Sequence, residues 1–165
     1  MNDKAKYYIE KLDLNKHPEG GYYKEVYRSG EHFIIPDYSL SKKKRNYSTS
    51  IYFLLEGNDK SNFHKLNSDE IWHFYDGSDL RIFIIDEFGN LSEILFGKEN
   101  EVFQFTIKKD CWFAAEVINK NSFSLIGCTV SPGFDFEDFE LAKRDQLIKL
   151  FPQHEAVIRK FTRVD

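Results

Sequence analysis

The chain has 165 residues, of which 41% are hydrophobic and 16% aromatic, and its formal net charge is −4. This length supports a substantial core, so we expect a single domain over residues 1–165. The mild acidity gives no electrostatic reason to expect nucleic acid or an anionic membrane surface as a partner. The basic run Lys42 to Arg45 is short, and we expect it to be a solvated loop.

Cys111 and Cys128 are the only cysteines, and both lie in apolar, strand-like stretches. We expect buried thiols there, and a disulfide between them is not required. The sequence shows no long apolar run and no secretory leader pattern. We therefore predict a soluble, cytoplasmic protein.

The N-terminal part is expected to form a helix followed by a strand. Lys4 to Leu14 carries apolar side chains on one side, and Asp3 is a suitable N-cap. After a turn rich in proline and glycine, Tyr22 to Ser29 is predicted to be a strand. Simple alternation puts Glu25 on one face of this strand and Arg28 on the other, which is typical of an edge strand, an interface or a pocket wall.

The chain up to residue 131 is expected to continue mostly as β structure. Gly30 to Asn46 contains a proline and the basic run, so we predict a long surface loop. Short apolar segments separated by turn residues follow, at a spacing typical of an all-β barrel or sandwich. The predicted strands are Thr49 to Leu55, a strand within Asn62 to Gly77, Leu80 to Asp86, Leu91 to Phe96, Val102 to Ile107, Cys111 to Ile118 and Phe123 to Ser131.

The C-terminal part has the composition of helices. Phe139 to Leu150 carries apolar residues at helical spacing, a proline ends this helix, and His154 to Phe161 is predicted to form a second one. We therefore expect a barrel over about residues 21–131 and a helical tail over about residues 139–163. The tail would close one end of the barrel or cover a sheet.

The segment Asn62 to Gly77 concentrates polar side chains suited to chemistry. Two sets of side chains alternate within it, which is typical of a strand with two different faces. His64 enters the segment six residues before Glu70, a spacing that can converge at the mouth of a barrel. Imidazole and carboxylate together suit a metal ion or proton transfer. The two alternating sets are Glu70, Trp72 and Phe74, and Ile71, His73 and Tyr75.

Several motifs resemble those of a known superfamily. The first cupin motif contains a Gly, a His-x-His pair, a Glu and a second Gly, and Gly57, His64, Glu70 and Gly77 stand at matching positions. Longer segments are similar to a small branch often called cupin family five, and together they span nearly the whole chain. These segments are HPEGGYYKEVYRS (His17 to Ser29), SDEIWHFYDG (Ser68 to Gly77), CWFAAEV (Cys111 to Val117) and GCTVSPGFDFEDFELA (Gly127 to Ala142).

The resemblance implies a double-stranded β-helix, which is a jelly-roll cupin barrel, with a pocket at one barrel mouth. It also implies a homodimer. The resemblance and the patterns above together predict an all-β fold with a short N-terminal helix and two C-terminal helices.

The resemblance also implies metal ligands, and here the sequence departs from it. Two of the four usual ligand positions are Leu66 and Phe113. His64 and Glu70 alone would hold a divalent ion poorly, because catalytic metal sites usually keep three protein ligands. We therefore expect a pocket without a metal. The alternative is a metal-dependent enzyme in which His64 and Glu70 bind a divalent transition metal.

The first hypothesis for function is a small-molecule-binding pocket for a polar, planar or sugar- or nucleotide-like metabolite. Aromatic walls with a few polar anchors suit such a ligand, and Glu70 is a candidate anchor. His73 and Glu116 are further candidates for the site, although alternation puts both on faces opposite the main set. The candidate wall residues are Trp72, Phe74 and Phe113.

The second hypothesis is a sugar epimerase or isomerase. The segment Pro18 to Glu25 resembles a nucleotide-holding segment of the dTDP-4-dehydrorhamnose 3,5-epimerases, although Glu19 stands where that family has an arginine. The likeness implies His64 as general base. Arg28 would meet an anionic group or form an ion pair with Glu25, and its residue type does not decide between these.

The third hypothesis is a purely structural or interaction role. Pro132 to Leu141 alternates phenylalanines with acidic residues, which could wrap a partner subunit. We favour a simpler interpretation, in which this segment anchors the tail to its own sheet and leaves the acidic side chains in water. That arrangement would be compatible with a pocket.

Overall fold

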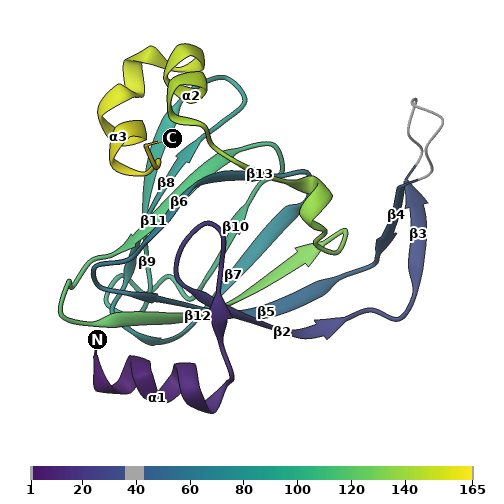
Figure 1. The fold of residues 1–165 in the computed structure, drawn as a ribbon, viewed down its shortest axis with the longest axis vertical. Helices are drawn as coiled ribbons and strands as arrows, with labels where there is room; N and C mark the ends of the chain where they lie inside the picture. Colours follow the sequence, from purple (N-terminus) through teal and green to yellow (C-terminus); the bar gives the residue numbers. More distant parts are fainter. Residues whose placement is uncertain (1, 36–42, 165) are drawn as a thin grey trace.

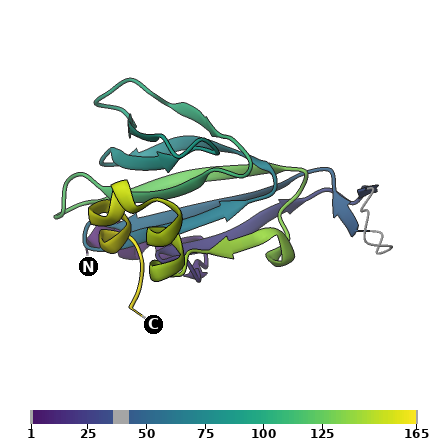
Figure 2. The same ribbon diagram turned by 90° about the horizontal axis from the view of Figure 1, so that it is seen from above.

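The computed structural model describes residues 2–35 and 43–164 and consists mainly of β-strands (Figure 1). Two antiparallel sheets face each other, and a two-stranded hairpin projects beyond one end of them (Figures 1 and 2). The helices lie on the outside of the sheets. They are α1 (Asp3–Lys11), α2 (Arg144–Leu150) and α3 (Glu155–Lys160), with the short 3-10 helices η1 (Phe136–Asp138) and η2 (Pro152–His154).

The strands form a jelly roll, as the sequence predicted. The first sheet has the order β1-β2-β5-β12-β7-β10, and the second has the order β13-β6-β11-β8-β9. The first sheet contains β1 (Asn15–Lys16), β2 (Tyr22–Arg28), β5 (Thr49–Glu56), β12 (Phe123–Ser131), β7 (Asp69–Gly77) and β10 (Gln104–Ile107). The second contains β13 (Phe139–Leu141), β6 (Lys60–Leu66), β11 (Trp112–Val117), β8 (Leu80–Ile85) and β9 (Leu91–Phe96). The hairpin pairs β3 (His32–Ile35) with β4 (Lys43–Asn46).

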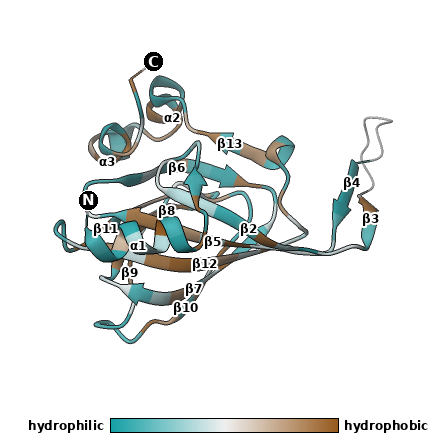
Figure 3. Cartoon of the chain, turned by 60° about the horizontal axis from the view of Figure 1, so that its bottom comes forward, coloured by the Kyte–Doolittle hydropathy of each residue, from teal (hydrophilic) through white to brown (hydrophobic). Residues whose placement is uncertain are grey.

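A hydrophobic core fills the space between the sheets, because alternate side chains of each strand point inwards. Trp72 on β7, Phe96 on β9 and Phe113 on β11 are almost fully buried in it. Fully burying a side chain such as Phe contributes about 1.5–3 kcal/mol. Hydrophobic residues accordingly follow β12 and β5 in the middle of the first sheet, whereas β4 is mostly hydrophilic (Figure 3).

Two smaller apolar clusters attach the helices to the outer faces of the sheets. Leu147 of α2 and Ile158 of α3 pack on outward side chains of the second sheet, and Ala5 of α1 packs on the first. The predicted C-terminal helices therefore cover a sheet. In the described part of the chain, no helix is both long and apolar enough to cross a membrane. Cys111 and Cys128 are both free, and only Cys128 is fully buried.

The N-terminal predictions need two corrections. The N-cap of α1 is Asn2 rather than Asp3, because Asn2 is extended and its side chain accepts hydrogen bonds from the backbone N–H groups of Lys4 and Ala5. The predicted strand is present as β2, but a β-bulge lies between Glu25 and Tyr27. The bulge inserts one extra residue, so Glu25 and Arg28 come to the same side of the strand instead of opposite sides.

The predicted surface loop over Gly30 to Asn46 is wrong for its two ends, which form β3 and β4. Its middle, residues 36–42, lies outside the described residues. The basic run is not uniformly solvated either, since Arg45 is only 5% exposed and forms ion pairs with Glu137 and Asp138. Acidic residues distant in the sequence thus provide the negative charges that allow Arg45 to be buried.

The helix predicted to begin at Phe139 begins instead at Arg144. Phe139–Leu141 is the edge strand β13 and pairs with β6. Aromatic and acidic residues alternate in this segment with the period of a strand, and an open strand edge is available beside it. The tail is therefore anchored to its own sheet, as favoured above, but its acidic residues are not all in water, because Asp138 contacts Arg45.

Candidate functional site

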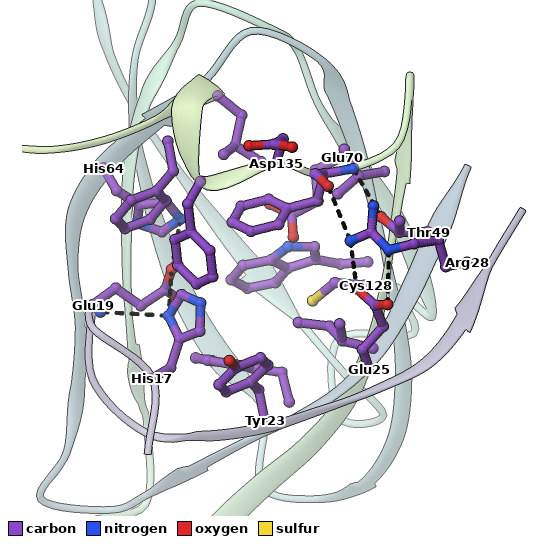
Figure 4. A pocket seen from close by; sticks show the side chains of 18 residues that line it. His17, Glu19, Tyr23, Glu25, Arg28, Thr49, His64, Glu70, Cys128 and Asp135 are labelled. Atoms are coloured by element: carbon purple, nitrogen blue, oxygen red, sulfur yellow. Dashed lines mark hydrogen bonds and ion pairs between the residues drawn. The ribbon is translucent and has the colours of Figure 1, made fainter. Parts of the chain in front are cut away.

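A cavity of about 280 Å³ lies between the two sheets at the end from which the hairpin projects. Side chains from β2, β5, β6, β7 and β12 point into it, and the segment from Phe134 to Phe139 covers part of its mouth (Figure 4). Its aromatic lining residues are Tyr23, Phe53, Trp72, Phe134, Phe136 and Phe139. Its titratable lining residues are His17, Glu19, Glu25, Arg28, His64, Glu70, Cys128 and Asp135.

Four buried residues, His17, Glu19, Ser61 and His64, form a hydrogen-bonded cluster on one wall. Oε2 of Glu19 lies 3.3 Å from Nδ1 of His17 and 3.1 Å from Nε2 of His64 (Figure 4). The hydroxyl of Ser61 donates to Oε1 of Glu19 at 2.8 Å. Nδ1 of His64 lies 2.8 Å from the carbonyl oxygen of Asn62, so both imidazole nitrogens of His64 have partners.

Local backbone structure brings Glu19 to this position. The side-chain amide and backbone N–H of Asn62 on β6 both donate to the carbonyl oxygen of Glu19, at 2.6 and 2.9 Å. Gly20 follows with φ of +125°, and a Cβ there would lie 2.0 Å from the carbonyl oxygen of Lys60. Only glycine allows this conformation and this close approach between the turn and β6.

The charges in the cluster stabilise an ionised carboxylate. Burial raises the pKa of Glu19, but the charges of His64 and His17 and the hydrogen bonds from His17 and Ser61 more than offset this, so its pKa is lowered. Burial lowers the pKa of His64, against the attraction of Glu19 and the hydrogen bond to Asn62. Because both nitrogens of His64 face acceptors, the contact with Glu19 requires a proton between Nε2 and Oε2.

Glu70 and Trp72 present polar atoms that have no partner. Both side chains lie on the inward face of β7 and are 7% and 1% exposed. Among the described residues, Oε2 of Glu70 and Nε1 of Trp72 make no hydrogen bond. Burial, and then the charge of Glu19, raise the pKa of Glu70 to about 8, against weaker opposing contacts with Trp72 and Cys128. Glu70 is therefore mostly a neutral carboxylic acid at neutral pH.

Arg28 does not offer a free guanidinium to the cavity. Its Nε and one terminal nitrogen donate to the two carboxylate oxygens of Glu25, at 2.9 and 2.7 Å. It also donates to Oδ1 of Asn46 and to the carbonyl oxygen of Phe134. The ion pair with Glu25 is thus the arrangement adopted, and Arg28 joins β2 to the segment at the mouth.

A buried arginine outside the cavity holds that segment in place. Nε of Arg45 donates to Oδ2 of Asp138 at 2.5 Å, and a terminal nitrogen donates to Glu137 at 3.0 Å. Lys43 also contacts Asp138, at 3.4 Å. These charges tether η1 to β4, and the phenylalanines on either side of the tether face the cavity.

The remaining predicted site residues lie elsewhere. Phe113 is buried below the cavity, with its ring centroid 4.0 Å from that of His64. Phe74 packs against the core beside Phe96. His73 is on the outer face of β7, beside Gln104 and Thr129, as alternation required. Glu116 pairs with Lys120 and Lys160 near α3 and does not line the cavity.

The prediction did not include His17, Glu19, Cys128 or the phenylalanines of the mouth segment among the site residues. His17 and Glu19 are in a turn, and they reach the cavity through hydrogen bonds to β6 that local patterns do not specify. The available signal was the pair itself, a His and a Glu two residues apart directly before two glycines.

A metal does not fit this arrangement well. Leu66 lines the cavity, and the ring of Phe113 covers one face of His64. The second nitrogen of His64 is already directed at Glu19. Over residues 2–35 and 43–164, no group of three or more His, Cys, Asp or Glu side chains is arranged to hold a metal ion.

Comparison with known proteins agrees with the fold and the motifs. Residues 6–142 match the family described as "Cupin superfamily (DUF985)", and the chain belongs to this family. It is 30% identical over 161 residues to the uncharacterised protein YML079W of Saccharomyces cerevisiae, covering 86% of this chain and 76% of that protein.

Solved structures show the same fold. A hypothetical protein from Leishmania major is 34% identical, with a TM-score of 0.87 over 97% of this chain and 99% of that one. Protein SO0799 from Shewanella oneidensis is 40% identical, with a TM-score of 0.87 over 98% of both chains. Oxalate decarboxylase from Bacillus subtilis is 13% identical, with a TM-score of 0.58 over 91% of this chain and 37% of that one, and supports the cupin fold alone.

Proposed function

We propose that the protein binds a small, planar, polar metabolite in the cavity at the barrel mouth, without a metal. The observation that carries this proposal is the pair of unpartnered polar atoms, Oε2 of Glu70 and Nε1 of Trp72, inside an aromatic-lined cavity. Leaving a buried polar group unpaired costs about 1–3 kcal/mol. A ligand that hydrogen-bonds to both atoms recovers that cost.

The chemistry of the two groups defines the edge that the ligand must present. The indole N–H of Trp72 donates only, whereas a protonated Glu70 both donates and accepts. A rigid edge with an acceptor beside a donor, as on an amide or a heterocyclic base, complements them. The flat rings of Tyr23, Phe53 and Phe136 favour a planar molecule over a saturated one.

The contacts in the cavity argue against three alternatives. Arg28 already donates four hydrogen bonds to Glu25, Asn46 and the carbonyl oxygen of Phe134, so it is not a ready site for a phosphate or carboxylate. A metal-dependent reaction through His64 and Glu70 would need further ligands from positions that are Leu66 and Phe113. An epimerase with His64 as base would need a free nitrogen on His64, and both of its nitrogens have partners.

Thermal denaturation with candidate ligands tests the proposal. We would use adenine, guanine and cytosine, with glucose as the non-aromatic control. A binding base at one hundred times its Kd stabilises the fold by about 2.7 kcal/mol. Glu70→Leu and Trp72→Phe should remove this shift, and Glu70→Gln should keep most of it because an amide mimics the protonated acid.

His73→Asn is the matched control, because His73 lies on the outer face of the same strand. It should respond to the base as the wild type does. A wild-type protein that no base stabilises, or equal shifts in wild type and Trp72→Phe, would contradict the proposal.

We also infer a homodimer that uses the projecting hairpin. β1 pairs only with Tyr22 and Tyr23, so the Lys24 to Arg28 part of β2 has a free edge among the described strands. Exposed apolar side chains are present here: Val26 on this edge, Ile34 on β3 and Tyr47 directly after β4. Free edges and clustered apolar side chains favour pairing with a second chain. Light scattering should give twice the chain mass of 19.5 kDa, and Val26→Asp should yield monomers.

A further inference from the structure

Two histidines contact the carboxylate of Glu19, but only one of them keeps a nitrogen for the cavity. His64 directs one nitrogen to Glu19 and the other to the carbonyl of Asn62. His17 directs Nδ1 to Glu19, and Nε2 is on the opposite side of the ring, facing the cavity (Figure 4). Among the described residues, Nε2 of His17 makes no hydrogen bond.

We propose that His17 is the general base of this pocket, with Glu19 orienting its ring. The inference rests on the proposed function, because the substrate is the metabolite bound in the same cavity. Nε2 of His17 takes a proton from a C–H or N–H next to a carbonyl or imine. The electron pair of the broken bond moves into the carbonyl or imine, and the imidazolium formed is paired with Glu19.

The carboxyl group of Glu70 can complete the reaction. It donates its proton to a second atom of the same molecule, so that the net change is a tautomerisation or isomerisation. His17 then gives up its proton and Glu70 regains one through solvent at the mouth. Atoms and electrons balance, and no co-reactant is needed.

The charges around the cavity match these roles. Against the effect of burial, His64, His17 and the hydrogen bond from Ser61 lower the pKa of Glu19, so it is an anion that can stabilise the imidazolium of His17 once that ring has taken up a proton. Glu70 is held protonated by burial and by the charge of Glu19, with a pKa of about 8. Two carboxyl groups with pKa values pushed in opposite directions within one pocket are typical of acid–base sites.

The proposal depends on which nitrogen of His17 carries the proton. Nδ1 lies 3.3 Å from the carboxylate of Glu19 and 3.4 Å from the backbone N–H of the same residue. The first contact requires a proton on Nδ1, and the second requires none. The charge-assisted bond to the carboxylate is the stronger of the two, so Nδ1 carries the proton and the lone pair of Nε2 faces the cavity.

This tautomer can be measured in the wild-type protein without a ligand, and a variant is needed only to assign the signals. Nitrogen-15 NMR of histidine-labelled protein distinguishes the two neutral tautomers by their chemical shifts. We expect His17, assigned by loss of its signals in His17→Gln, to carry its proton on Nδ1. A proton on Nε2 would overturn the proposal, because no lone pair would then face the cavity.

Base activity can be tested with 5-nitrobenzisoxazole, a planar probe that reports proton abstraction. A base removes its ring C–H proton, the N–O bond breaks, and a coloured cyanophenolate forms. Because general bases contribute typically 10²–10⁴-fold, His17→Gln should slow the reaction by about 10²-fold. Glu19→Gln should slow it less, and His73→Asn should not change it.

The outcomes separate this inference from the proposed function. A wild-type rate no higher than that of free imidazole, or equal rates in wild type and His17→Gln, would overturn the role of His17. Ligand-induced stabilisation that depends on Glu70 and Trp72 would survive either result. Loss of that stabilisation with His17-dependent elimination intact would instead leave the base in place and remove the proposed ligand contacts.

Discussion

Oε2 of Glu19 lies 3.1 Å from Nε2 of His64, so the turn between β1 and β2 is joined to β6 through a buried charged contact. The histidine of the cupin motif therefore supports a carboxylate instead of presenting a free ligand nitrogen. This changes the chemistry of the barrel mouth, because His17 and Glu19, which come from a turn outside the central strands, line the cavity together with Glu70 of β7. The stability of the fold should depend on the same contact.

Glu19→Ala should destabilise the protein strongly. The substitution leaves His17, His64 and Ser61 without their shared acceptor, and breaking a buried pair typically costs about 3–5 kcal/mol. Urea denaturation would measure the loss. The control is Glu25→Ala, which removes an ion pair whose two side chains are 37% and 38% exposed and should cost under about 1 kcal/mol. Similar losses in the two variants would contradict the central role of Glu19.

Glu70 should make the protein less stable as the pH rises. Its pKa is about 8 in the folded protein and 4.5 in its ordinary state, so the folded state binds more protons between these values. The free energy of unfolding should therefore fall from about pH 4.5 to about pH 8, by an amount on the order of a few kcal/mol. Above that range this group adds no further slope.

Glu70→Gln provides the comparison, because its amide does not titrate. Urea denaturation across this pH range should show a flatter profile for the variant, with the largest difference from wild type at the alkaline end. Parallel profiles for the two proteins would mean that Glu70 is ionised in the folded state, against the structural argument.

Arg45 should control the order of the mouth segment. Arg45→Met leaves Asp138, whose side chain is only 10% exposed, with the more distant Lys43 as its remaining cation. We expect a loss of about 3–5 kcal/mol, since a buried charge loses its partner. Hydrogen exchange should rise over residues 134–139.

A double-mutant cycle gives the control for this prediction. Asp138→Asn combined with Arg45→Met should cost clearly less than the sum of the two single changes, because the second change removes a charge that the first left unpaired. Additive losses would show that the two side chains do not depend on each other.

The sequence alone predicted the elements that depend on local pattern. The strands β5 and β12 are mostly apolar segments ended by turns, and the inward set on β7 follows directly from alternation. The hairpin of β3 and β4 was missed because each strand has only four residues and β4 is made almost entirely of basic residues. Burial of Arg45 needed acidic partners more than ninety residues away, which no local pattern reveals.

In the candidate site, too, the sequence predicted residues that belong to a local pattern and missed those placed by distant contacts. His64, Glu70 and Trp72 were found because they share one segment of the chain with the motif. The bulge after Glu25 reversed the expected position of Arg28, since one inserted residue changes the face of everything that follows. His17 and Glu19 acquire their roles only when the turn is hydrogen-bonded to β6, and this contact is made on folding.

Because two histidines of the cupin metal-binding pattern are replaced in this chain, restoring them should create a metal site. Leu66 and Phe113 stand where the cupin pattern has histidines, and both lie beside His64 in the fold. In the double variant Leu66→His, Phe113→His, the two new histidines and His64 would lie next to Glu70. This set meets the usual requirement of three or more protein ligands. Elemental mass spectrometry should find about one zinc or manganese ion per chain in the double variant and far less in the wild type. The double variant should also be stabilised by added zinc and destabilised by chelator, which separates metal binding from simple misfolding.

Leu66→Val with Phe113→Leu is the matched control, because it perturbs the same packing without adding ligands. Stoichiometric metal in the wild type, lost in His64→Ala, would show that other groups complete the site and would return metal-dependent chemistry to the pocket.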